Sequence, residues 1–495
     1  MSTNMNLACE HNPTRQPTGI TILGLGPGHS RYLTREAWTV LESATEVWLR
    51  TDRHPVVAGL PPSLKLHSFD RLYEETGSFT ELYETIAEEI LQLGRRPQGV
   101  IYAVPGHPLV GEATVKHLLL RAREEGLPVH IVEGLSFIEP VLTALHLDAL
   151  PGLQICDALE IAARHHPPLN PDLPALVAQI YDRLLAGDVK LTLMNQYPDD
   201  HEVVLVQAAG TPEESLIHLP LYELDRQDIN HLTTLYIPPL PHPGGFESFQ
   251  DTVARLRAPG GCPWDREQTH ESLRGGLLEE AYETLAAIDA GDLRALQEEL
   301  GDLLLQVLIQ TQIATEAGEF KMVDVIAGID AKLKYRHPHV WGEQRVKNAQ
   351  EVLQRWEKLK RAEKGGERSV LDGIPVALPA LQQADACSRR AARVGFDWSN
   401  PAGVADKVRE EMDELEKATS PEEREAELGD LLFAIVNWAR WLGLDAETAL
   451  RKANARFARR FRAMEMMARA QGLDMSALAI EELESLWQRA KDNET

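Results

Sequence analysis

Cysteine is scarce in this chain, and the spacing of the few cysteines excludes two kinds of site. The 495 residues contain four of them, none within a CxxC pair: Cys9, Cys156, Cys262 and Cys387. Such scattered thiols predict neither a disulfide framework nor a cysteine-ligated zinc site. A reducing cytoplasm is therefore the expected location.

Long apolar runs and a surplus of basic residues are also missing. No apolar run approaches the ~18 residues that cross a membrane, and Met1–Thr18 has no apolar stretch typical of a signal peptide. The 50 Lys and Arg residues against 76 Asp and Glu residues give a net charge of −26. Because nucleic-acid binding depends on Lys and Arg contacts to phosphate, we expect neither a nucleic-acid nor a membrane partner.

The pattern of secondary structure changes halfway along the chain. Short apolar runs, such as Ile20–Leu23 and Val100–Val104, alternate with helical patterns in the first half and predict an α/β domain. The Pro- and Gly-rich stretch Pro238–Gly245 predicts a linker with few obligate contacts between the halves. Helical patterns then dominate, with a break at Glu363–Pro375. The predicted organisation is an α/β domain, a linker and two all-α segments, over residues 18–238, 239–246, 247–362 and 374–495.

The two all-α segments are repeats of one unit. Four landmarks recur: Trp264 and Trp398, Glu280 and Glu411, Glu299 and Glu427, and Trp356 and Trp487. Their offsets are 398 − 264 = 134, 411 − 280 = 131, 427 − 299 = 128 and 487 − 356 = 131. Offsets this constant indicate a duplicated bundle of about four helices with small loop changes.

Each repeat carries five carboxylates on two consecutive helical stretches. They are Glu279, Glu280, Glu283, Glu299 and Asp302 in the first repeat, and Glu410, Glu411, Glu414, Glu427 and Asp430 in the second. Within each stretch the spacing keeps them inside an arc of about 100°, so two antiparallel helices would bring five acids to one place. A solvated acidic surface is the alternative, but it gives no reason to repeat acid type and spacing.

The acid clusters predict a divalent metal. We expect no lysine or arginine within these stretches to neutralise the acids, and like charges at this distance repel one another. Oxygen ligands suit Mg²⁺ or Mn²⁺. Iron is disfavoured, because di-iron bundles use Glu-x-x-His and no histidine stands at the fourth position.

The helical half resembles the MazG family of nucleoside triphosphate pyrophosphohydrolases in its duplicated form. The matching motifs are "GCPWD", "LLEEAYE", "ELGDLLLQ", "RHPHVWG", "VGFDW", "EEMDE", "ELGDLLFA" and "KANARFARRF". The resemblance implies Mg²⁺-dependent hydrolysis of a nucleoside triphosphate to a monophosphate and pyrophosphate, often by a homodimer. Housecleaning of the nucleotide pool would be the role of such an enzyme.

The second repeat is the one we expect to be catalytic, through Glu411, Glu414, Glu427 and Asp430. It alone continues into a cationic stripe, whose residues Lys452, Arg456 and Arg459 point within about 60° of one another on a helix. In the first repeat Pro338 stops the helix after Lys332 and Arg336. The predicted substrate-binding residues are Lys452, Asn454, Arg456, Arg459, Trp487 and Lys491. A solvated surface for the stripe and ordinary packing for Trp487 and Lys491 remain the alternatives.

Three glycine turns follow strand-like runs in the first half: "GLGPGHS", "VPGHPLVGE" and "EGLSFIEP". The first is not GxGxxG, because its sixth position is His29. Together with "LTLMNQY", read as a further strand that contacts the cofactor, the turns resemble the tetrapyrrole methylase family, which binds S-adenosylmethionine between two α/β lobes. The resemblance points to Gly26, Pro27, Gly28, Pro105, Gly106, Ser136 and Met194 as cofactor-binding residues.

The sequence departs from that family at two places. The family's methyltransferases commonly have aspartate where this chain has His29 and His107. The whole fusion, with "LRTDRHPVV" and "GHP", resembles the YabN-type proteins. The alternative function is therefore an S-adenosylmethionine-dependent methyltransferase or sensor that uses its helical half for dimerisation.

Overall fold

The computed structural model describes residues 19–75, 79–349, 351–352, 355–356, 359 and 369–492. Two compact units, Met1–Ala327 and Gly328–Thr495, divide within a helix of the first repeat, and each is described by itself. Predicted boundary positions 18, 362 and 495 and part of the break at 363–375 lie outside the described residues. Within the described part, no helix has the length and apolar content that a membrane crossing requires.

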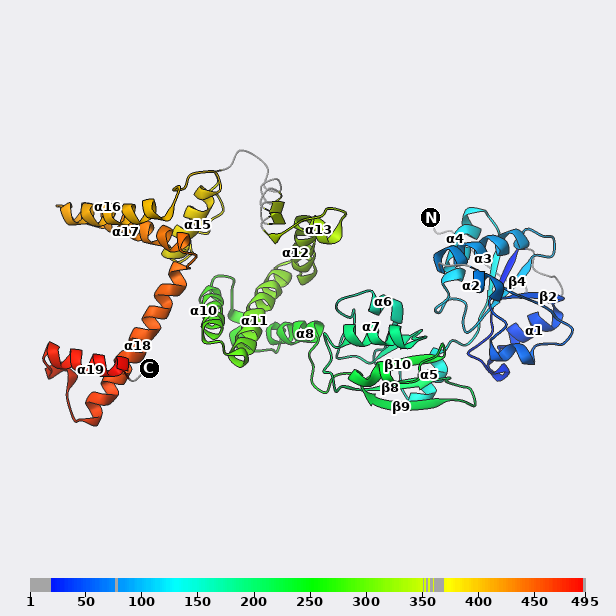
Figure 1. Cartoon of the computed structure of the whole chain (residues 1–495). Helices are drawn as coiled ribbons and strands as arrows, with labels where there is room; N and C mark the ends of the chain where they lie inside the picture. The colour runs from blue at the N-terminus through cyan, green and yellow to red at the C-terminus, as the bar shows by residue number, and fades with distance from the viewer. Residues whose placement is uncertain are drawn as a thin grey trace. The chain divides into compact units, whose positions relative to one another are not determined.

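The first lobe is a parallel sheet with helices on both faces (Figure 1). Its strands, in the order β3-β2-β4-β1-β5, are β1 (Ile20–Gly24), β2 (Glu46–Leu49), β3 (Lys65–Ser68), β4 (Val100–Val104) and β5 (Val129–Val132). The helices are α1 (Arg35–Ser43), α2 (Asp70–Glu75), α3 (Phe79–Gly94) and α4 (Ala113–Glu124), with 3-10 turns η1 (Ser30–Tyr32) and η2 (Pro55–Gly59). Helices α3 and α4 cover one face and α1 the other, so the central strands are apolar on both sides.

The second lobe is a mixed five-stranded sheet in the order β6-β7-β10-β8-β9. Its strands are β6 (Gln154–Asp157), β7 (Ala175–Ala178), β8 (Glu202–Gln207), β9 (Ser215–Pro220) and β10 (Thr233–Ile237). Helices α6 (Ala158–Ala162) and α7 (Arg183–Leu193) and the turn η3 (Leu221–Arg226) cover one face, and α5 (Ile138–Leu145) covers the other. The prediction of an α/β first half is confirmed.

The rest of the chain is helical, as the sequence predicts. The first unit continues with α8 (Phe246–Arg257), α9 (Pro263–Glu267), α10 (Arg274–Ala290) and α11 (Leu293–Ala317), and α12 (Met322–Arg336) spans the division between the units. The second unit contains α13 (Pro338–Trp341), α15 (Ala380–Ala392), α16 (Pro401–Lys417), α17 (Pro421–Trp441), α18 (Ala446–Ala470), η4 (Met475–Ala477) and α19 (Ile480–Asp492). Pro338 begins a new short helix, so α12 stops where the sequence predicts it.

The linker is clamped to the second lobe, which corrects the expectation of few contacts. Asp172 accepts hydrogen bonds from the backbone nitrogens of Gly244 and Gly245, at 2.7 and 3.0 Å, and from the hydroxyl of Ser248. The Ser248 bond is the main reason that the pKa of Asp172 lies below its usual value. A carboxylate from the second lobe therefore binds the chain where it enters α8, and it satisfies the N–H group of the N-cap residue Gly245.

Candidate functional site

The first acid cluster lies between α10 and α11. Helix α10 ends at Ala290 and is capped by Gly291, which has a φ of 69°. Asp292 then caps α11 by accepting from the nitrogens of Arg294 and Ala295. This short turn makes the helices antiparallel neighbours. Carboxylate oxygens of Glu280, Glu283 and Glu299 consequently lie within 4.8 Å of one another.

The second cluster repeats this geometry between α16 and α17. Ser420 caps α17 and exchanges hydrogen bonds with Glu423 in a capping box, which starts the acid-bearing helix at a defined residue. Oxygens of Glu411, Glu414 and Glu427 lie within 4.8 Å of one another. The repeat in the sequence is therefore also a repeat of carboxylate geometry.

The remaining predicted acids lie around these groups of three. Burial and the charges of Asp302 and Glu283 raise the pKa of Glu280, and burial followed by Glu283 does the same for Glu299. In the second repeat, burial, Glu414 and Glu411 raise the pKa of Glu427, and Asp430 adds to the effect. Asp302 and Asp430 thus act on the clusters electrostatically, and Glu279 and Glu410 are exposed neighbours on the same helices.

A lysine enters the second cluster, contrary to the expectation that no cation neutralises it. The Nζ atom of Lys407 lies 2.8 Å from a carboxylate oxygen of Glu410 and 2.8 Å from one of Glu411. Hydrogen bonds to these two acids raise the pKa of Lys407 above its usual value. Lys407 stands one helical turn before Glu411, and the offset of 131 places Gly276 at the matching position of the first repeat (407 − 131 = 276). The clusters therefore differ by one positive charge.

The carboxylate groups fit a divalent metal. All ligand atoms are oxygens, the donor set that Mg²⁺ and Mn²⁺ prefer. Burial first and the neighbouring carboxylates second raise the pKa values of Glu280, Glu299 and Glu427, and a bound cation would offset both effects. One lysine in the second cluster does not balance three converging carboxylates.

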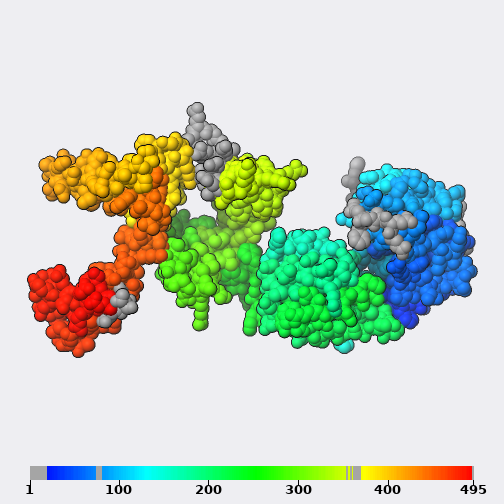
Figure 2. Space-filling model, in the orientation of Figure 1, coloured from blue at the N-terminus to red at the C-terminus, as the bar shows by residue number. Residues whose placement is uncertain are grey.

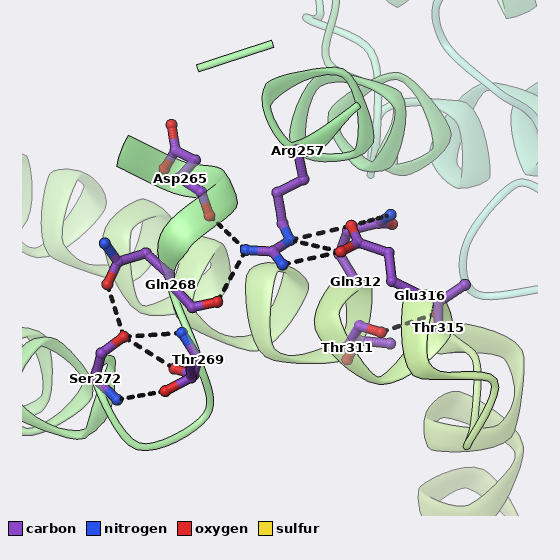
Figure 3. A network of polar contacts seen from close by, with 9 residues as sticks. All are labelled: Arg257, Asp265, Gln268, Thr269, Ser272, Thr311, Gln312, Thr315 and Glu316. Atoms are coloured by element: carbon purple, nitrogen blue, oxygen red, sulfur yellow. Dashed lines mark hydrogen bonds and ion pairs between the residues drawn. The ribbon is translucent and has the colours of Figure 1, made fainter. Parts of the chain in front are cut away.

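A buried arginine fixes the short helix α9, which contains Trp264, in the first repeat (Figure 3). Arg257, whose side chain is 6% exposed, donates to Glu316 of α11 at 2.9–3.2 Å. It also donates to the carbonyl oxygens of Asp265 and Gln268, on either side of the turn that ends α9. The guanidinium thereby fixes the segment after Trp264 against the end of the acid-bearing helix.

The second repeat has a matching ion pair next to Trp398, but the positions of the acid and the arginine are exchanged. Here the arginine is on the acid-bearing helix: Arg440 of α17 donates to Asp397 at 2.5 Å, and the indole of Trp441 donates to the same carboxylate at 3.0 Å. Asp397 directly precedes Trp398. In both repeats an Arg–carboxylate pair thus joins the segment around the tryptophan to a neighbouring helix, although different residues form the pair.

Replacing Arg257 by alanine is expected to destabilise the protein by about 2 kcal/mol, because Glu316 and two carbonyl groups lose their donor. This corresponds to a fall in Tm of roughly 4–8 °C, measurable by calorimetry. Arg255→Ala is the matched control, because Arg255 is an exposed residue of the same helix. Equal melting temperatures for the two variants would show that the network is not stabilising.

The predicted substrate-binding residues lie on α18 and α19. Lys452, Asn454, Arg456 and Arg459 are exposed on one continuous helix, whose orange middle part is visible in Figure 2. Trp487 packs at 5.2 Å between ring centroids against Phe457, and Arg460 lies over its ring. Lys491 is exposed at the end of α19. These contacts give Trp487 a packing role, and the substrate role of the whole set stays a prediction.

The three glycine turns converge where β1, β4 and β5 end. Gly26 and Gly106 exchange backbone hydrogen bonds of 3.2 and 2.8 Å. A Cβ atom on Gly24 would lie 2.7 Å from the Gly106 oxygen and 2.7 Å from the Gly134 nitrogen, so only glycine permits this approach. The turns are neighbours because β1 lies between β4 and β5 in the sheet.

The turns fit a small ligand bound against backbone. Gly106 has a φ of 67°, and a Cβ there would meet nothing nearer than 3.9 Å, at Ser136. A side chain at Gly106 would fill this space beside the carboxyl ends of parallel strands, where α/β folds bind cofactors. His29 and His107 each accept a hydrogen bond from the backbone two residues ahead, so they brace the turns locally.

The strand predicted around Met194 is wrong. The segment is the end of helix α7, and Met194 is its C-cap, packed against the core of the second lobe. Sequence reasoning missed Lys407 and also Gln179, which follows strand β7 with a φ of 64° and donates to the Gly111 carbonyl of the first lobe at 3.0 Å. The only signal for Gln179 in the sequence is its place after the apolar run "ALVA".

Comparison with known proteins finds a different family in each half of the chain. The tetrapyrrole (corrin/porphyrin) methylase model matches residues 19–225, and the MazG nucleotide pyrophosphohydrolase domain model matches residues 268–341. The nucleoside triphosphate pyrophosphohydrolase of Escherichia coli (strain K12) is 47% identical over 250 residues, which are 49% of this chain and 95% of that protein. A Thermotoga maritima protein named nucleoside triphosphate pyrophosphohydrolase/pyrophosphatase MazG is 46% identical over 247 residues, 50% of this chain and 95% of that protein.

Similarity also extends over the whole chain. The uncharacterized protein YabN of Bacillus subtilis (strain 168) is 41% identical over 491 residues, with 96% of this chain and 99% of that protein covered. Among solved structures, uroporphyrin-III-C-methyltransferase from Thermus thermophilus shares 20% identity over 45% of this chain and 93% of its own, with a TM-score of 0.36, too low to support an argument. The chain therefore belongs to the same family as the Bacillus subtilis protein, in which a tetrapyrrole methylase domain is joined to a MazG domain.

Proposed function

We propose that this protein is a Mg²⁺-dependent nucleoside triphosphate pyrophosphohydrolase that removes unwanted nucleotides from the cytoplasmic pool. The observation that carries the proposal is the pair of three-carboxylate groups, one in each helical repeat. The 47% identity to an enzyme named nucleoside triphosphate pyrophosphohydrolase supports the same reaction.

The reaction is hydrolysis between the α- and β-phosphates. Water attacks the α-phosphorus, the bond to the bridging oxygen breaks, pyrophosphate leaves, and the proton of the water passes to a carboxylate. A bound Mg²⁺ supplies charge neutralisation and polarisation of the phosphate. Glu411, Glu414 and Glu427 would hold the metal, and Glu427 or Asp430 would accept the proton.

Cationic residues of the second repeat would handle the phosphates. Lys407 is already bonded to Glu410 and Glu411, and a triphosphate offers it a second set of oxygen acceptors. The exposed residues Lys452, Arg456 and Arg459 supply further charge on α18. The first repeat has Gly276 in place of the lysine, which favours the second repeat as the catalytic one.

The test is the product of each nucleoside triphosphate incubated with the full-length protein and Mg²⁺. Equal amounts of monophosphate and pyrophosphate are expected. Release of diphosphate and orthophosphate would contradict the bond assignment, and no turnover with any triphosphate would favour the alternative of a methyltransferase or sensor.

We also propose that the first half binds S-adenosylmethionine at the convergent glycine turns. Gly26, Pro27, Gly28, Pro105, Gly106 and Ser136 would surround it, and the open space at Gly106 supports this placement. Ser136 donates to Glu139 through both its nitrogen and its hydroxyl, so its backbone position is set. Calorimetric titration of the full-length protein should show saturable heat with S-adenosylmethionine. Absence of heat at millimolar ligand would refute the proposal.

A homodimer is the assembly we propose. Helix α17 exposes five large apolar side chains: Leu428 at 47%, Leu432 at 47%, Phe433 at 44%, Ile435 at 41% and Trp438 at 38%. Exposed apolar surface of this kind marks an interaction site. Light scattering should give twice the chain mass of 55.2 kDa, and a monomer at micromolar concentration would contradict the dimer.

A further inference from the structure

The most buried acid of the second cluster is already paired with a lysine. The Nζ atom of Lys407 lies 2.8 Å from a carboxylate oxygen of Glu411, whose side chain is 7% exposed, and 2.8 Å from one of Glu410. The other two converging acids, Glu414 and Glu427, form no ion pair within the part of the chain that the structure describes. A positive charge therefore already contacts one of the three acids that would hold the metal.

The first cluster has the same three acids and no such partner. Glu280, Glu283 and Glu299 converge within the same 4.8 Å as their counterparts, and none of them forms an ion pair with another described residue. Gly276 stands one helical turn before Glu280, where the second repeat has Lys407 (407 − 131 = 276). The two clusters therefore offer a metal the same oxygen ligands in different electrostatic surroundings.

A neutral side chain replaces the lysine in the first repeat. A Cβ atom on Gly276 would lie 3.2 Å from the Nε2 atom of Gln306, so the amide of Gln306 lies beside the glycine. The offset of 128 between the acid-bearing helices puts Ala434 at the matching position of the second repeat (306 + 128 = 434). The first repeat thus has a glutamine from α11 at this place, and the second has a lysine from α16.

A lysine and a metal ion cannot both neutralise Glu411 without repelling each other. A divalent cation carries two positive charges, and repulsion from an ammonium group a few ångströms away persists in solvent, although salt screens it. Repulsion of this size changes a dissociation constant about tenfold. The first cluster, with an uncharged amide at the same place, exerts no such repulsion.

We propose that Lys407 competes with the metal for Glu411, so that without nucleotide the second cluster binds a divalent cation about tenfold more weakly than the first. The metal enters the second cluster as Lys407 leaves Glu411. This inference rests on the metal of the proposed function, in which a triphosphate offers Lys407 other acceptors. It adds the order in which the two clusters fill, with the first cluster binding its cation before any nucleotide is present.

Mn²⁺ titration of the full-length, nucleotide-free protein tests this order, with the electron paramagnetic resonance signal of free Mn²⁺ as the readout. Two sites per chain are expected, with dissociation constants that differ about tenfold. Glu299→Gln should weaken the tighter site, and Glu427→Gln should weaken the other. Loss of the tighter site in Glu427→Gln would overturn the proposal.

Lys407→Gln isolates the effect of the charge, because glutamine keeps a polar side chain of similar reach and a similar helix propensity. The two sites should then have similar affinities. Arg409→Gln is the matched control: it removes a charge from the same helix, where Arg409 pairs with Asp406 and not with the converging acids. This control should keep the tenfold difference, and circular dichroism confirms the fold of each variant.

Moving the lysine into the first repeat gives the converse test. Gly276→Lys/Gln306→Ala copies the residues of the second repeat and removes the amide that a side chain at 276 would meet. The tighter site should weaken about tenfold. An unchanged ratio of the two dissociation constants in Lys407→Gln, in folded protein, would overturn this inference alone. Absence of bound Mn²⁺ at either cluster would contradict the metal of the proposed function as well.

Discussion

Replacing Glu427 by glutamine is expected to lower kcat for triphosphate hydrolysis by ~10²-fold or more, as loss of a metal ligand or general base does. Glutamine keeps the size of the side chain and removes its charge. Glu427 is the α17 member of the second three-carboxylate group, so the change disrupts the site without opening a cavity. Steady-state kinetics with saturating triphosphate would measure the effect.

Glu299→Gln is the matched variant, because Glu299 has the same place in the first repeat. We expect it to keep most of the activity, since Lys407 and the cations of α18 belong to the second repeat. Asp430→Ala should likewise lower kcat strongly, and Asp302→Ala should keep most of the activity. Equal losses from the two members of either pair, in folded protein, would show that both repeats work or that they share one site.

Removing divalent metal is expected to abolish hydrolysis, with a fall of ~10²-fold or more after exhaustive chelation. A triphosphate brings about four negative charges to carboxylates that already repel one another. Burial, and after it this repulsion, raises the pKa values of Glu280, Glu299 and Glu427. Mg²⁺ or Mn²⁺ should restore activity, and Zn²⁺, which prefers nitrogen and sulfur ligands, should do so less well.

The chelation experiment also decides what Lys407 does. If the lysine alone neutralised the second cluster, turnover would survive chelation. Lys407 supplies one positive charge to Glu410 and Glu411, and Glu414 and Glu427 remain beside them. Undiminished turnover in metal-free buffer would therefore assign the neutralising role to lysine and arginine side chains.

Local patterns were enough to predict the acid-bearing helices and the glycine turns of this chain. The duplicated unit, the carboxylate positions and the start of α13 at Pro338 depend on helical periodicity and on proline, which act within a few residues. The three glycine turns followed in the same way from apolar runs that end in glycine. Their convergence at β1, β4 and β5 is a consequence of parallel strands, whose carboxyl ends share one edge.

Only the tertiary structure showed which of these groups meet, because contacts between distant segments depend on packing. The packing of the two helices brings three of the five carboxylates together in each cluster. In the second cluster Lys407 also contacts one of these three, Glu411. The Met194 segment failed as a strand because an apolar run of that length fits a buried helix equally well. Asp172 clamps a linker 72 residues away, and Gln179 reaches across to Gly111 of the first lobe. Such pairings leave no periodic trace in the sequence, since each depends on one side chain reaching another lobe or helix after the chain has folded.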